Sequence, residues 1–189
     1  MGKENIIFSG VRTKKVLLIV ALLLVFASSS NLSATNINLF GGSILFTSET
    51  PTGFGVSLET IKGPDMVENK PQIAMGLASR CDIGFTSLDV NGFYTNLLVG
   101  AGSTIMITKN FGISLYLGPS CFFYFGNVEG TNKTKATGGL GIGGGADLLF
   151  TFGYPSFVLK AGAIAGYQFI FTNKKPTVLG IDVSVGFSF

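Results

Sequence analysis

The side chains that could carry chemistry in this chain are few, because 12% of its 189 residues are charged and none is histidine. Six charged residues stand inside segments that alternate between apolar residues and small or polar ones, always on the small and polar side: Glu59, Arg80, Asp82, Asp147, Lys160 and Asp182. Charges in such positions could work as an acid–base pair, pair with one another inside the fold, or set the selectivity of a passage.

Catalysis is the least favoured of these roles. The lack of histidine excludes every His-dependent triad and every metal site with a His ligand. Asp147 and Asp182 are predicted to point the same way, but Lys160 lies on the strand between them, and Arg80 and Asp82 stand two residues apart on one face. Since buried charges need partners, we predict two ion-pair networks, with no enzyme activity, no cofactor and no metal.

The elements that must position these charges are strands. Over residues 178–189 apolar and small residues alternate with period two, which is typical of a strand and not of a helix. The same period recurs along the chain and predicts eight strands in meander order. In the first two the phase is least defined, because Gly41 and Gly42 could mark a bulge. The predicted strands cover residues 37–47, 53–61, 72–85, 94–107, 112–126, 139–152, 157–171 and 178–189.

Charge placement predicts which face meets water. Of the eighteen charged residues after Val16, twelve fall in predicted turns and only the six named above in strands. Six charges cannot coat a soluble barrel, so the polar face is predicted to line a narrow interior and the apolar face to meet lipid. The eighteen are balanced in sign, which leaves no basic footprint for nucleic acid.

The first residues have the pattern of a secretory signal peptide. Arg12, Lys14 and Lys15 precede an apolar run over residues 16–27, and small or polar residues follow up to Ala34. We predict cleavage after Ala34, with Ser29 and Ser30 as alternatives. An uncleaved anchor is the competing interpretation, but twelve apolar residues fall short of the ~20 that a spanning helix needs. The predicted organisation is a signal peptide over residues 1–34 and one β-barrel over residues 35–189.

The signal peptide, the eight alternating strands and a final strand ending at Phe187 and Phe189 together resemble small bacterial outer-membrane β-barrels of the OmpA, OmpX and OmpW kind. The resemblance implies an all-β fold, an eight-stranded antiparallel up-and-down transmembrane barrel in the outer membrane of a diderm bacterium. It also implies two partners, the lipids of that membrane and the barrel-assembly machinery, which would recognise Phe187 and Phe189 as a C-terminal assembly signal. A secreted soluble β-protein is the alternative.

Two non-enzymatic functions follow. The first is a narrow passive pore for small solutes, including hydrophobic ones, because many inward positions are glycine and Tyr94, Tyr116, Phe122 and Tyr124 form an inward aromatic lining. The excess of inward carboxylates would make such a pore prefer cations. The second is a structural or surface-interaction (adhesin-like) protein with a plugged lumen, for which residues 127–138 are the one predicted outer loop of useful size.

Two further patterns are assigned to the barrel itself. Residues 139–144 fit G-x-G-x-x-G, but period two continues after them, and a dinucleotide site needs a helix there. Cys81 and Cys121 fall on the apolar face with one strand between them. Two strand spacings amount to about 9.6 Å, beyond the ~7 Å limit for a disulfide, so both thiols are predicted to stay reduced.

Overall fold

The computed structural model describes residues 34–64, 71–86, 92–127, 134–152, 157–171 and 175–188. Within these ranges no helix is long and apolar enough to cross a membrane. The described chain forms eight strands: β1 (Ala34–Thr47), β2 (Gly53–Pro64), β3 (Gln72–Thr86), β4 (Gly92–Thr108), β5 (Phe111–Asn127), β6 (Thr134–Phe152), β7 (Phe157–Ile170) and β8 (Thr177–Ser188).

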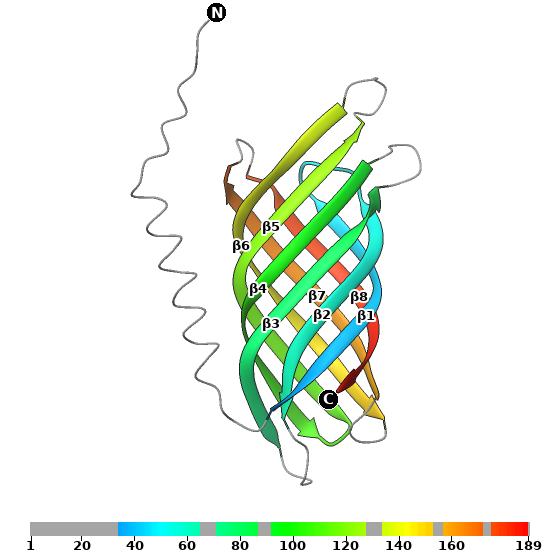
Figure 1. The fold of residues 1–189 in the computed structure, drawn as a ribbon, viewed down its shortest axis with the longest axis vertical. Helices are drawn as coiled ribbons and strands as arrows, with labels where there is room; N and C mark the ends of the chain where they lie inside the picture. The colour runs from blue at the N-terminus through cyan, green and yellow to red at the C-terminus, as the bar shows by residue number, and fades with distance from the viewer. Residues whose placement is uncertain are drawn as a thin grey trace, which may run out of the picture.

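The strands close into a barrel in sequence order, each antiparallel to the next, with β8 paired back to β1 (Figure 1). The start of β1 and the end of β8 lie at one end, which we call the terminal end, where Ile37 pairs with Ser188. The end of β1 and the start of β2 lie at the opposite, distal end, as do the corresponding ends of β3 and β4, of β5 and β6, and of β7 and β8. The predicted eight-stranded antiparallel up-and-down barrel is confirmed.

Side chains alternate between the two faces of the wall. The inward side chains are buried, whereas the outward ones form an exposed apolar surface that includes Leu117 at 63% and Val183 at 61%. Exposed phenylalanines gather at the terminal end, where the Phe157 and Phe187 ring centroids lie 6.0 Å apart. Near the distal end Phe85 and Phe93 have the same spacing. The outer face is therefore mainly apolar, with aromatic residues at both rims.

Several predicted boundaries differ from the observed ones. The predicted outer loop 127–138 is too long, because Tyr124 pairs with Thr137 and Gly126 with Lys135. Backbone ladder bonds extend over small and polar residues whose side chains add no apolar period, so the alternation missed them. The connection between β5 and β6 shortens to residues 128–133.

The irregularities of the wall also lie elsewhere than predicted. Gly41 and Gly42 keep continuous register with both β2 and β8, so they mark no bulge. The register instead shifts between Met106 and Thr108 and between Leu140 and Gly141. The predicted signal peptide and Phe189 lie outside the described residues, apart from Ala34, which begins β1.

Candidate functional site in the lumen

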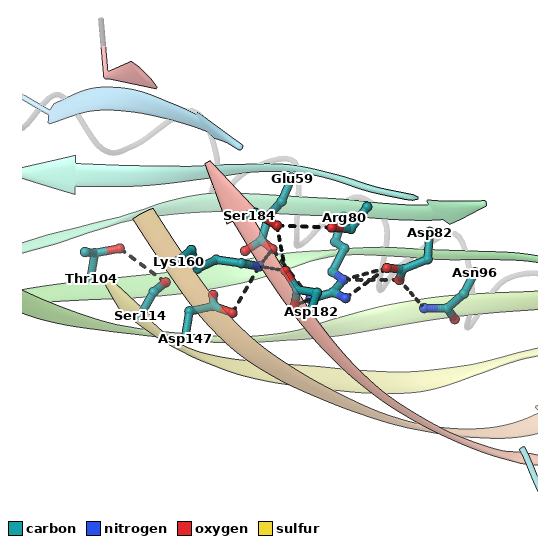
Figure 2. Close-up of polar contacts among 11 residues, drawn as sticks. Glu59, Arg80, Asp82, Asn96, Thr104, Ser114, Asp147, Lys160, Asp182 and Ser184 are labelled. Carbon is teal, nitrogen blue, oxygen red and sulfur yellow. Dashed lines mark hydrogen bonds and ion pairs between the residues drawn. The ribbon is translucent and has the colours of Figure 1, made fainter. Parts of the chain in front are cut away.

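The centre of the lumen is occupied by the guanidinium of Arg80, which lies between two carboxylates. Its Nη1 donates to Asp182 Oδ1 at 2.5 Å, and its Nη2 donates to Asp82 Oδ1 at 2.8 Å. Its Nε lies 3.1 Å from both Asp82 oxygens. Arg80 on β3 thus reaches across the lumen to β8, two strands beyond its own neighbour β2 (Figure 2).

Lys160 on β7 forms the second centre of positive charge. Its Nζ contacts Glu59 Oε2, lies 2.8 Å from Asp182 Oδ2 and lies 3.3 Å from Asp147 Oδ1. Asp182 therefore bridges the two basic groups. Glu59 does so too, since its Oε2 lies 3.7 Å from Arg80 Nη1. The sequence predicted two separate networks, whereas closure of the barrel joins all six residues into one.

Two neutral side chains that the sequence did not single out complete this network. Asn96 on β4 donates from Nδ2 to Asp82 Oδ2 at 3.2 Å. Ser184 on β8 donates from Oγ to Asp182 Oδ2 at 2.7 Å and lies 3.2 Å from Ser57 Oγ. Asparagine and serine on an inward face are unremarkable in a sequence, so only the register could have identified them.

The charged network is closed to solvent. The side chains of Arg80, Asp82, Asp147, Lys160 and Asp182 are 0% exposed, and that of Glu59 is 1% exposed. It contains four carboxylates against two basic groups. In the low dielectric of such an interior the ion pairs are strong, but unpaired charge is costly.

Apolar side chains fill the lumen on both sides of the charges. Toward the distal end lies a buried cluster of Leu45, Tyr94, Phe122, Tyr124 and Val178. It contains three of the four predicted lining aromatics. A larger cluster extends toward the terminal end and contains Tyr116. Leu149 points inward there and is 0% exposed. The four predicted lining aromatics are all inward, and each is at most 5% exposed.

At several inward glycines the structure has close neighbours and not the free space that a pore prediction from missing side chains requires. A Cβ at Gly84 would overlap the Phe54 carbonyl oxygen and lie 2.6 Å from the Cα of Gly55. A Cβ at Gly100 would likewise overlap the backbone of the neighbouring strand, at the Leu117 carbonyl. Position 145 is covered by the ring of Tyr116. These glycines allow neighbouring strands and inward tyrosine rings to approach closely.

The remaining singled-out residues lie on the outer face. Phe187 points outward and is 52% exposed. Cys81 and Cys121 each pair with Leu97, from opposite sides, and both are free thiols. Within the described ranges, no three His, Cys, Asp or Glu side chains are grouped so as to hold a metal ion.

Fold and lumen together define a class: an eight-stranded, closed, apolar-walled barrel with the fold of outer-membrane β-barrel proteins. No protein-family model matches the chain, and no curated protein matches its sequence. The solved attachment invasion locus protein Ail of Yersinia pestis has a TM-score of 0.56 at 15% identity, over 84% of this chain and 99% of that one.

Two other solved structures have the same fold. Ail in complex with the heparin analogue sucrose octasulfate matches with a TM-score of 0.55 at 16% identity, over 84% of this chain and 100% of that one. Neisserial surface protein A matches with a TM-score of 0.56 at 11% identity, over 83% of this chain and 97% of that one. At these identities the likeness is one of fold.

Proposed function

We propose that this chain is a non-enzymatic integral protein of the bacterial outer membrane with a plugged lumen, acting as a structural or surface-interaction protein. The lumen carries this choice over a passive pore. Six charged side chains in its middle are at most 1% exposed, and apolar clusters lie on both sides of them. Such packing supports a rigid, filled barrel more than a path for solutes.

The outer wall supports the location in a membrane. The barrel wall is built from strands of 12 to 19 residues. A strand of 12 residues at 3.3 Å rise, tilted by about 40°, spans roughly 30 Å along the barrel axis. That exceeds the ~25 Å apolar band of outer-membrane barrels. Exposed apolar side chains cover this height, so the lipids of the membrane are the proposed partner of the wall. The barrel-assembly machinery is the proposed partner of β8.

A surface role places the working residues at the distal end. Lys135 joins the first connection to β6 there, since its Nζ donates to the Glu49 carbonyl oxygen at 2.6 Å. Lys175, two residues before β8, is a further basic residue of this end among the described residues. Because Ail was solved with a heparin analogue, heparin is a suitable first probe for binding by cells that display the protein.

The deciding experiment is conductance of the refolded protein in planar bilayers. Folding is verified first by heat-modifiable migration on gels, so that a silent bilayer cannot be attributed to unfolded protein. We expect a heat-modifiable barrel that gives no steady conductance. A steady conductance with cation preference would support the pore instead, with the excess of inward carboxylates as its selectivity element.

A further inference from the structure

The buried network carries more negative than positive charge. Its four carboxylates have two basic partners among the described residues, Arg80 and Lys160. With every group ionised, a closed interior would hold an excess of two negative charges. Isolated buried charge is so costly that carboxyl groups in this situation take up a proton instead.

The carboxylates are unequally partnered. Asp182 accepts hydrogen bonds from Arg80 and Ser184 and contacts Lys160. Asp82 is likewise held by two donors. Asp147 differs, because neither of its oxygens accepts a hydrogen bond, although the residue is 1% exposed. Its contact in the network is the 3.3 Å ion pair with Lys160 (Figure 2).

Glu59 provides a second buried carboxyl oxygen without a hydrogen-bond partner. Its Oε2 contacts Lys160 Nζ, the same nitrogen that Asp147 faces, while its Oε1 is buried without a hydrogen-bond partner. The two carboxyl groups that have oxygens without a hydrogen bond thus converge on one ammonium group. A protonated carboxyl gains an O–H donor, and an ionised carboxylate accepts such a donor strongly.

We infer that the folded barrel is a proton-binding site, in which Asp147 carries one proton at neutral pH and shares it with Glu59. The proton comes from solvent and is bound when the lumen closes during folding, converting one carboxylate to a neutral acid and removing one negative charge. The ionisable groups that interact with Asp147 come from four strands: Glu59 (β2), Tyr116 (β5), Lys160 (β7) and Asp182 (β8). The inference concerns the lumen alone and does not depend on what the distal end binds.

The test compares two substitutions of the same chemical kind. Asp147→Asn replaces a neutral acid with a neutral amide of the same size, so the barrel should fold with an unchanged or higher urea midpoint. Asp182→Asn is the matched control, because it neutralises a carboxylate that Arg80, Lys160 and Ser184 all hold; its urea midpoint should fall or folding should fail. If Asp147→Asn does not fold, or loses as much as Asp182→Asn, the inference is wrong.

Infrared spectroscopy of the folded wild-type protein gives a second, independent readout. A protonated carboxylic acid has a C=O stretch apart from the carboxylate bands, and it shifts on exchange into D₂O. We expect this band at neutral pH in the wild type and its loss in Asp147→Asn. No such band in wild-type protein that is verified as folded would overturn the inference, whether or not bilayers show a conductance.

Discussion

At the scale of single residues, the packing of the lumen depends on the positions of glycines as much as on the charged side chains. Gly162 on β7 pairs with Asp147 on one side and with Asp182 on the other. Its lack of a side chain leaves the space in which these two carboxylates and Lys160 meet. A Cβ there would overlap Asp147 Oδ1 and lie 2.8 Å from Asp182 Oδ1 and 3.1 Å from Lys160 Nζ.

Gly162→Ala is therefore expected to lower the free energy of unfolding by about 1–3 kcal/mol, the usual cost of overpacking a filled interior. Gly166→Ala is the control on the same strand and face. There the nearest atom to an added Cβ would be Gln168 Nε2 at 3.3 Å, which is a milder contact than at Gly162. Urea unfolding, monitored by far-UV circular dichroism because the chain has no tryptophan, measures the stability of both variants. Equal losses would mean that the charged network does not need the space at position 162.

Each strand presents one face to the filled lumen and the other to the exterior, so a single step along it changes the environment completely. On β8, Val183 is 61% exposed on the apolar wall, whereas Ser184 next to it is 1% exposed and bonded within the lumen. Positions on the outer face also differ in their distance from the rim of the barrel, from mid-strand to the strand ends. Thr177, the first residue of β8, is exposed at the distal rim.

If the wall meets lipid, the cost of a charge on it depends on that depth. Val183→Arg, at mid-strand, should lose about 2–4 kcal/mol of folding free energy, and Thr177→Arg, on the same strand at the rim, about 0–1 kcal/mol. Folding into lipid vesicles with urea titration measures both. Similar small losses for the two variants would argue against a lipid-facing wall on β8.

At the scale of the whole molecule, an even number of strands places the start of β1 and the end of β8 on the same side of the barrel. Successive strands then run in opposite directions, so that the turn between β4 and β5, which contains Lys109, lies at the terminal end, whereas the end of β5 and the start of β6 lie at the distal end. If assembly leaves the termini in the periplasm, the distal end faces the medium.

Trypsin added to intact cells should then cut after Lys133, in the β5–β6 connection, and spare Lys109. Mass spectrometry of the fragments identifies the site, and cells with a permeabilised outer membrane provide the control in which Lys109 becomes reachable. Cleavage at Lys109 but not at Lys133 in intact cells would reverse the orientation.

Local patterns were enough to predict the fold class and the inward direction of the six charges assigned to strands, but they placed Lys62 and Lys135, which belong to β2 and β6, in turns. Period two depends only on neighbours along one strand, and the paucity of charge on the apolar face indicates lipid without any knowledge of pairing. The same reasoning predicted that Cys81 and Cys121 stand too far apart to bridge, and the register places Leu97 between them.

Tertiary structure decided what the inward residues do to one another. The contact of Arg80 with Asp182 joins residues 102 positions apart, and it exists only because β8 closes onto β1 and brings the two sides of a narrow barrel within reach of one guanidinium. From the sequence alone, inward glycines suggest free space, because the order of residues does not show how closely neighbouring strands approach. Closure brings backbone and tyrosine rings against these glycines, and it leaves Asp147 buried with neither of its oxygens accepting a hydrogen bond.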